Sequence, residues 1–281
     1  MAAGAATAVR RDRDMVRVAG PEARAYLQGQ LSQDMDALVL GEAAYTFVLQ
    51  PTGKVDAWLR VTRIADAAFL LDVESGWGEA VLVRLTRFLL RTDCTVEVVD
   101  WEMVTVIDAE PDTVDIPVGG VAIPVDWPGL QGVDLLGPSV VIPDGMEEVD
   151  GAVWEYRRIA AGIPVMAVEM DESTIPGATG VVNRSVSFTK GCYTGQELVA
   201  RVDSRNAGTP TRLVRATGNG PAPVAGSEIT LDGDLAGRLT SVAADPDGVG
   251  LGFVALAEVR RAVKVPATVD AGDVEVSLLA E

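Results

Sequence analysis

The sequence contains no histidine, and its 281 residues include only two cysteines, Cys94 and Cys192, and three lysines. The absence of histidine excludes Ser-His-Asp and Cys-His catalytic groups, zinc sites with histidine ligands and histidine proton shuttles. Two cysteines cannot by themselves fill a four-cysteine zinc or iron–sulfur site. So few cysteines in a chain of this length indicate a reducing compartment rather than a disulfide-stabilised fold.

Basic residues are also scarce. The chain has 23 lysines and arginines against 41 aspartates and glutamates, which gives a formal net charge of −18. Such a surface repels phosphate backbones, so we expect no direct nucleic-acid partner and a monomeric chain. Acidic, lysine-poor surfaces occur in halophilic proteins, because carboxylates stay hydrated in concentrated salt. The alternative is an ordinary acidic protein encoded by a GC-rich genome.

No apolar run is long enough to cross a bilayer. The short apolar segment at residues 1–9 precedes Arg10, Arg11 and Arg13, the reverse of the order in a signal peptide. We therefore expect a cytoplasmic protein with no membrane partner, in which residues 1–13 form a loose tail.

Apolar residues make up 48% of the chain, enough for a substantial core. Their spacing predicts an α+β region over residues 14–207, followed by a barrel domain over 208–281. In the first region we expect strands at 15–18, 43–49, 55–64, 68–73, 95–99 and 104–107, and helices at 23–35, 78–90 and 154–161. In the second, short β-rich segments alternate with turns and predict a small antiparallel barrel or sandwich, with strands at 211–216, 228–231, 250–254, 262–269 and 274–279.

The segment that carries most chemical information reads KGCYTGQE over residues 190–197. Thr194 and Glu197 have the spacing of a capping box, which predicts a helix that begins at this point. Cys192 then lies just before the positive end of a helix, with Lys190 two residues upstream, and both features favour the thiolate. The alternative is a well-capped helix beside a buried cysteine. Cys94 is expected in a strand, turned into the core.

This octapeptide resembles the signature of the folate-binding YgfZ family, whose relatives include the glycine-cleavage T-protein, an aminomethyltransferase. Flanking segments resemble the family in order and spacing: YLQGQL at 26–31, PTGKVD at 51–56, RIAAGIPV at 158–165, VSF at 186–188 and LVAR at 198–201. The resemblance implies an aminomethyltransferase-like fold with three lobes, two of them α+β and the third a C-terminal antiparallel barrel. It also implies a tetrahydrofolate or a derivative as cofactor, and support of iron–sulfur protein assembly or repair, with an indirect effect on tRNA modification.

The resemblance also implies a set of site residues. Cys192 and Lys190 would form the reactive pair, with Cys192 at most a transient ligand of a cluster that an iron–sulfur client or carrier protein shares. We expect no resident metal. Folate contacts would come from Asp56, Arg158, Tyr193, Gln196, Glu197 and Arg201.

Several of these residues also have structural interpretations. Asp56 is alternatively a solvated strand residue, and Tyr193 an anchor for its loop rather than a stacking platform. Arg158 would bind folate carboxylates or else pair with Glu155 or Glu172. Arg201, four residues beyond Glu197, has the spacing of an ion pair on one helix face.

A second hypothesis is folate-dependent aminomethyl or one-carbon transfer of the T-protein type. T-proteins carry paired aspartates where this chain has Asp56 followed by Ala57, and a glutamate in the position of Ala160. Aminomethyl transfer needs acid and base groups at the folate nitrogens. The two missing carboxylates argue against that activity, although Asp56 remains, and whether any chemical step is catalysed stays open.

Overall fold

The computed structural model describes residues 6–204, 208–246, 248, 250 and 252–280. It divides the chain into two units: one holds residues up to 149 together with 182–200, and the other holds 150–181 together with the residues from 201 onward. In the described part of the chain, no helix is long and apolar enough to cross a membrane.

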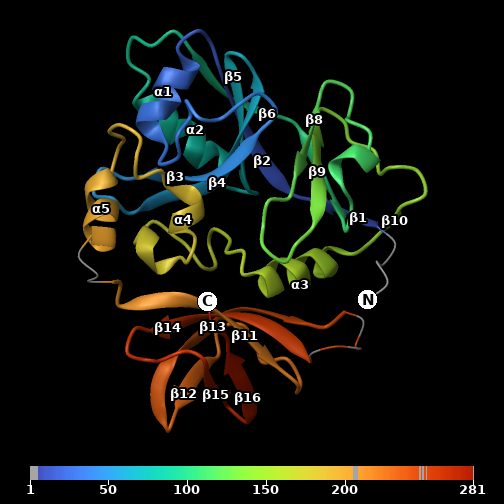
Figure 1. Ribbon diagram of the computed structural model, residues 1–281, viewed down its shortest axis with the longest axis vertical. Helices are drawn as coiled ribbons and strands as arrows, with labels where there is room; N and C mark the ends of the chain where they lie inside the picture. Colours follow the sequence, from blue (N-terminus) through green and yellow to red (C-terminus); the bar gives the residue numbers. More distant parts are fainter. Residues whose placement is uncertain (1–5, 205–207, 247, 249, 251, 281) are drawn as a thin grey trace. The chain divides into compact units, whose positions relative to one another are not determined.

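The first unit is built on two five-stranded sheets. One of them is antiparallel and has the order β3 (Ala43–Leu49), β4 (Val55–Ala65), β5 (Ala68–Glu74), β2 (Arg13–Ala19) and β6 (Thr95–Val99). Helices α1 (Ala23–Gln30) and α2 (Gly78–Arg87) pack against β5, β2 and β6 (Figure 1). The short helix α4 (Val182–Ser185) packs against β3.

The second sheet contains a strand from the expected tail. Its order is β10 (Glu147–Glu148), β1 (Thr7–Arg11), β7 (Glu102–Ile107), β9 (Gly132–Gly137) and β8 (Val121–Pro124). Strand β1 runs antiparallel to β7, and Ala8 and Val9 are buried. The prediction of a loose tail over residues 1–13 is therefore wrong from Thr7 onward, because the apolar side chains of β1 complete the core of this sheet.

The two sheets meet through an apolar cluster and a buried ionic cluster. Met15 and Leu70 of the first sheet pack with Met103, Ile123 and Leu136 of the second. The ionic cluster is centred on Arg13, Arg60, Asp72 and Asp134, and at its edges Arg11 lies 4.0 Å from Asp134 and Glu74 pairs with Arg13.

Arg60 is the centre of this ionic cluster and is only 4% exposed. Its Nε lies 2.9 Å from Asp72 Oδ2 in the same sheet, and its Nη1 lies 2.5 Å from Asp134 Oδ2 in the other. Arg13 Nη2 holds the second oxygen of Asp72 at 2.8 Å, and the Thr105 hydroxyl donates to Asp134 Oδ1 at 2.5 Å. Polar contacts thus fix how the two sheets pack.

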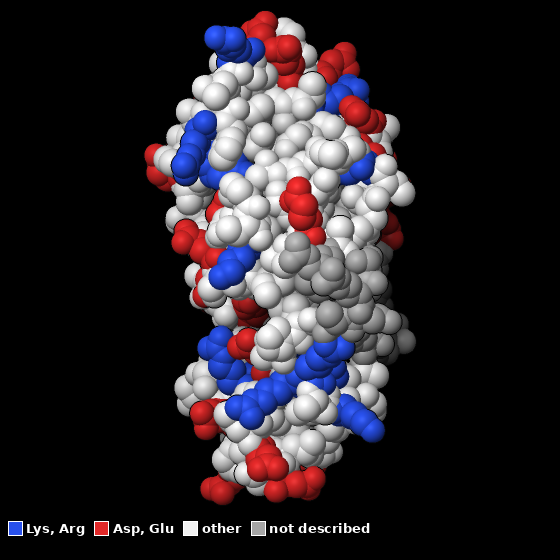
Figure 2. Space-filling view, turned by 90° about the vertical axis from the view of Figure 1, so that its left-hand side faces the viewer, with Lys and Arg blue, Asp and Glu red and all other residues white. Residues whose placement is uncertain are grey.

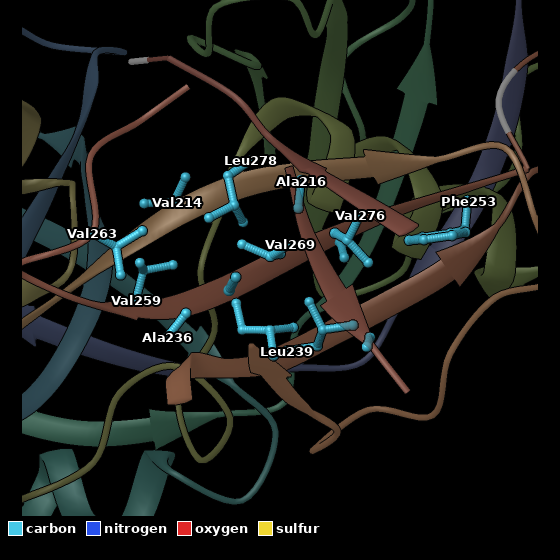
Figure 3. Packing of buried hydrophobic residues seen from close by; sticks show 14 residues of the cluster. Val214, Ala216, Ala236, Leu239, Phe253, Val259, Val263, Val269, Val276 and Leu278 are labelled. Atoms are coloured by element: carbon cyan, nitrogen blue, oxygen red, sulfur yellow. The ribbon is translucent and has the colours of Figure 1, made fainter. Parts of the chain in front are cut away.

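The second unit contains helix α3 (Gly151–Ala161) and a closed six-stranded barrel. The barrel strands follow the order β11 (Thr211–Gly218), β14 (Phe253–Arg260), β13 (Asp234–Ala244), β12 (Glu228–Leu231), β15 (Ala267–Ala271) and β16 (Val274–Leu278). Side chains such as Leu239, Phe253 and Val276 fill its interior (Figure 3). Ile159 of α3 packs on Val254 and Leu256, so residues 150–181 group with the barrel instead of with the α+β region expected over 14–207.

Candidate functional site

The signature loop, defined here as residues 186–195, lies in the first unit and leads from α4 to α5 (Gln196–Ser204). Its base is anchored by buried hydrogen bonds. The Ser32 hydroxyl donates to the Ser185 carbonyl at 2.5 Å, the Ser187 amide donates to the Ser32 carbonyl at 3.0 Å, and Trp58 Nε1 donates to the Ser185 hydroxyl at 2.8 Å. The loop therefore starts from a fixed point on strand β4 and on the segment after α1.

Lys190 ties the middle of the loop to the end of helix α1. Its Nζ donates to the carbonyl oxygens of Gln28, Leu31 and Gln33 at 2.7, 2.8 and 2.7 Å. An ammonium group has three protons, so these carbonyls use all of them. The end of a helix carries partial negative charge, which favours a cation at this position. Lys190 is thus a tether, and its donors are not directed at Cys192.

The environment of Lys190 also sets its charge. Burial lowers the pKa of Lys190 to about 8, against the opposing effect of Asp34 and Asp36, which raise the pKa. The side chain therefore remains mostly charged at neutral pH.

The last residue of the loop packs against the turn between β3 and β4. Gly195 and Gly53 both have a left-handed backbone, with φ of 80° and 85°. A Cβ on Gly195 would lie 2.4 Å from the Gln50 carbonyl oxygen, and a Cβ on Gly53 would lie 2.3 Å from Cβ of Leu198. Only glycine fits at either position, because the two backbones touch.

This contact changes how helix α5 begins. The helix starts at Gln196, preceded by Gly195, while the Thr194 amide donates to the Gly29 carbonyl at 3.1 Å. The Gln196 side chain reaches back instead of Glu197, and its Oε1 accepts from the Tyr193 amide at 3.2 Å. The predicted capping box is wrong by one residue, because the left-handed Gly195 stands between Thr194 and the helix.

Cys192 is exposed near the end of this anchored loop. Its neighbour Tyr193 is half-buried, and the Lys190 ammonium lies 5.2 Å from the centre of the Tyr193 ring. Burial, together with the nearby charge of Glu197, raises the pKa of Tyr193 to about 12, so the phenol keeps its proton at neutral pH. Tyr193 thus packs against the Lys190 side chain within the loop, and its contact with a folate stays a prediction.

Asp56 lies at the start of β4 and forms an ion pair that the sequence did not reveal. Arg84 Nε of helix α2 lies 2.9 Å from Asp56 Oδ2. The same guanidinium donates to Gln30 Oε1 at 3.1 Å and to the Leu49 carbonyl at 2.8 Å. Asp56 is thus fixed in direction while its side chain stays 24% exposed. The sequence feature that could have identified Arg84 is its position in the last turn of helix α2, which packs on this sheet.

The structure also contains an aromatic cluster that the sequence did not predict. The rings of Tyr45 and Trp58 stack at 4.8 Å with an angle of 10° between their planes, and Trp127 meets both rings edge-on. Arg184 lies 4.9 Å from the centre of the Trp127 ring. Since Trp58 also holds Ser185, this cluster supports the base of the signature loop.

Arg158 is buried within the second unit. Its Nε and Nη2 donate to Glu155, its Nη1 donates to the Ile163 carbonyl at 3.0 Å, and its Nη2 donates to the Ser241 hydroxyl at 3.0 Å. This matches the ion pair with Glu155, although the side chain is 3% exposed rather than on the surface. A folate contact by Arg158 stays a prediction.

The remaining predicted residues differ in their environments. Glu197 is exposed and Gln196 half-buried, while the side chain of Arg201 lies outside the described residues. Cys94 precedes β6 and is only partly buried, so its prediction as a core strand residue is wrong. Burial, with Glu22 and Asp93 nearby, raises the pKa of the Cys94 thiol. Among the side chains that the structure describes, no group of three or more acidic or cysteine residues is arranged to hold a metal ion.

Comparison with known proteins found no matching family model. The chain is 26% identical over 268 residues to the tRNA-modifying protein YgfZ of Vibrio atlanticus, covering 87% of this chain and 82% of that protein. It is 27% identical over 213 residues to the mitochondrial iron–sulfur cluster assembly factor IBA57 homolog of Pyricularia oryzae, covering 69% of this chain and 53% of that protein.

Among solved structures, the chain is similar to the glycine cleavage system aminomethyltransferase T of Bartonella henselae. The TM-score is 0.80 with 17% sequence identity, and the match covers 98% of this chain and 85% of that chain. Together with the mixed sheets and the closed barrel, this confirms the predicted α+β, aminomethyltransferase-like fold.

Proposed function

We propose, on the premise that this chain is a member of the YgfZ family, that it supports the assembly or repair of iron–sulfur proteins and, through them, tRNA modification. In this proposal Cys192 is the reactive group, and a tetrahydrofolate or a derivative is the cofactor. The observation that carries it is an exposed thiol on a loop whose other parts are fixed, by the Lys190 tether and by the contact of Gly195 with the β3–β4 turn.

A fixed loop suits a thiol that must meet a partner in one geometry, because little conformational freedom is then lost on binding. One thiolate supplies one ligand of an iron–sulfur cluster or one nucleophile. The remaining ligands must come from a client or carrier protein. The cluster is cargo in this scheme, and Cys192 holds it only during transfer.

Folate binding is supported by the shared fold and by the chemistry of Asp56. A pterin ring presents N–H donors, and Asp56 offers a partly exposed, oriented carboxylate as acceptor. Among the described residues, none accepts a hydrogen bond from the side-chain amide of Gln196, whose Oε1 accepts from Tyr193, and Glu197 is exposed at the next position. Arg158 would have to release Glu155 before it could bind a folate carboxylate, so we assign it a structural role.

The proposal is tested by rescue of a bacterial strain that lacks its own YgfZ, with the activity of an iron–sulfur enzyme as the readout. The Cys192→Ala variant should reduce that activity to the level of the empty vector, because the exposed thiol is lost. Cys94→Ala is the matched control and should rescue as well as the natural chain, since that thiol is partly buried with a raised pKa.

The same assay separates the second hypothesis, one-carbon transfer through Asp56. That hypothesis is favoured by the oriented Asp56 carboxylate in a fold shared with aminomethyltransferase T. Full rescue by Cys192→Ala, together with none by Asp56→Ala, would replace our proposal with the transferase.

Tetrahydrofolate should raise the melting temperature of the purified chain. Binding to the native state alone adds about 2.7 kcal/mol of stability at a ligand concentration of 100 times Kd. Asp56→Ala should reduce this shift, whereas Asp66→Ala should not, because Asp66 is 97% exposed in a turn. Differential scanning fluorimetry makes the measurement, and no shift at millimolar tetrahydrofolate would remove the cofactor from the proposal.

A further inference from the structure

A cavity of about 270 Å³ lies in the second unit, between the segment at residues 167–178 and the outer face of the barrel. The barrel side of its lining comes from β11, β13 and β14 and from the residues just before β11. Figure 2 shows basic side chains gathered over the barrel on one face of the molecule, in contrast to the net charge of −18. The residues proposed for iron–sulfur chemistry belong to the first unit, so this cavity calls for a separate explanation.

The floor of the cavity is an ordered pair of opposite charges. Strand register places Glu258 opposite both Leu213 and Arg238 on the outward face of the barrel. The Thr211 hydroxyl donates to Glu258 Oε1 at 3.0 Å, and Arg238 Nε donates to Oε2 at 2.9 Å. Both oxygens of Glu258 are therefore held, and this fixes the direction of the Arg238 guanidinium.

The two terminal nitrogens of the Arg238 guanidinium are available to bind a ligand. Within the described residues, its terminal nitrogens Nη1 and Nη2 have no hydrogen-bond partner, and its side chain is 56% exposed. Two parallel N–H groups of a guanidinium match the two oxygens of a carboxylate. The floor thus offers one oriented site for a carboxylate.

The opposite wall is held in shape by its own hydrogen bonds. Asp171 Oδ1 accepts from the Ser173 amide at 2.8 Å and from the hydroxyls of Ser173 and Thr174 at 2.6 and 3.0 Å. These bonds, led by the one from the Ser173 hydroxyl, lower the pKa of Asp171, so its carboxylate is charged at neutral pH. Ala167, also in the lining, holds a left-handed backbone with φ of 67°, which is costly for a residue other than glycine.

The balance of charge indicates what the cavity accepts. Glu258 already neutralises Arg238, and Asp171 adds a further negative charge. The third carboxylate of the lining, Glu169, is buried and is held by Arg158 and the Ser241 hydroxyl. A dianion such as a phosphate ester would therefore be repelled. A simple amine would leave the Arg238 edge unused. A zwitterion satisfies both, with its carboxylate on Arg238 and its ammonium group beside the carboxylates of Glu258 and Asp171.

The apolar part of the lining determines which side chain the ligand carries. Val168, Ile175 and Leu213 line the cavity and offer a surface for an aliphatic side chain. We propose that this cavity binds a small aliphatic amino acid as a free zwitterion, held by Arg238, Glu258 and Asp171.

The test uses the full chain and isothermal titration calorimetry with L-valine. Isovalerate, which lacks the amine, and isobutylamine, which lacks the carboxylate, are the matched probes, and each should bind at least about tenfold more weakly than valine. Arg238→Gln should weaken valine binding by about tenfold or more, because the charge-assisted bonds are lost. Arg260→Gln is the control, since Arg260 is exposed on the same strand as Glu258 but is not part of the lining.

Circular dichroism establishes that both variants are folded before titration. Absence of valine binding at millimolar concentration, or equal affinity in the two arginine variants, would overturn the proposal. A folate tail also carries carboxylates, so p-aminobenzoylglutamate is titrated as well. If it binds more tightly than valine and loses that affinity in Arg238→Gln, the cavity belongs to folate recognition and the amino-acid proposal fails.

Discussion

Replacing Arg60 with methionine should lower the free energy of unfolding by about 3–5 kcal/mol, the usual cost of removing one partner from a buried ion pair. Methionine fills much of the same space, so the loss comes from charge rather than from a cavity. Arg60 is the residue that joins Asp72 in one sheet to Asp134 in the other. Without it, both carboxylates remain buried, with exposed fractions of 1% and 2%, and each has lost its bond to the guanidinium.

Urea denaturation followed by tryptophan fluorescence measures this loss. Arg17→Met is the matched control on the same sheet, because Arg17 pairs with Glu97 at the surface, with side chains 37% and 51% exposed. An exposed pair contributes about 0–1 kcal/mol. Similar losses in the two variants would show that the ionic cluster does not hold the sheets together.

The same Arg60→Met variant should also change the pH at which the protein unfolds in acid. Burial alone raises the pKa of Asp72, but Arg60 and Arg13 together hold it below the ordinary value. A carboxylate with a lowered pKa stabilises the native state above its unfolded pKa of about 3.9, and this contribution is lost as the pH falls through the native pKa. Removing Arg60 raises the native pKa of Asp72, so acid unfolding should begin at a higher pH than in the natural chain.

Apolar periodicity predicted most of the helices and strands, and the elements that it missed have local causes. The strand predicted at 43–49 coincides with β3, and those predicted at 55–64 and 68–73 correspond to β4 and β5. Strand β13 was missed although it is 11 residues long. Gly237 weakens its pattern, and a bulge between Leu239 and Ser241 interrupts the alternation of inward and outward side chains.

The strand predicted at 262–269 is wrong over residues 262–266, whereas residues 267–269 lie in β15. Strand β15 begins only at Ala267, directly after Pro266, which has no amide proton to donate to a neighbouring strand. The prediction rested on apolar composition alone and did not take account of this proline.

The sequence pointed to the loop that holds Lys190 and Cys192, and the roles of these residues stay predictions. The contacts that anchor this loop lie far away along the chain. The three carbonyls that bind Lys190 are 157 to 162 residues upstream, and Arg84 is 28 residues from Asp56. The spacing in the sequence predicted that Lys190 acts on Cys192. In the structure, the Lys190 ammonium group donates its hydrogen bonds to carbonyl oxygens at the end of helix α1 and just after it. Sequence patterns register neighbours within a few positions, so contacts made by tertiary packing stayed hidden.

Replacing Gly195 with alanine should release the signature loop from the β3–β4 turn. The new Cβ would lie 2.4 Å from the Gln50 carbonyl oxygen and 2.8 Å from Cβ of Leu49, and neither atom belongs to a flexible side-chain end. Overpacking of this kind costs about 1–3 kcal/mol, and the left-handed backbone adds about 1–2 kcal/mol for a residue other than glycine. We expect a loss of roughly 2–5 kcal/mol in stability, or a loop that leaves its position to avoid the clash.

Gly191→Ala is the matched control four residues earlier in the same loop, because a Cβ there meets no atom within 4 Å. Hydrogen exchange across residues 186–195 and the rate at which Cys192 reacts with a thiol reagent measure how firmly the loop is held. In Gly195→Ala the exchange should accelerate, the thiol reactivity should change and rescue of the iron–sulfur enzyme should fall, while Gly191→Ala behaves like the natural chain. Unchanged exchange together with full rescue in Gly195→Ala would mean that Cys192 acts without the fixed geometry that the glycine contact provides.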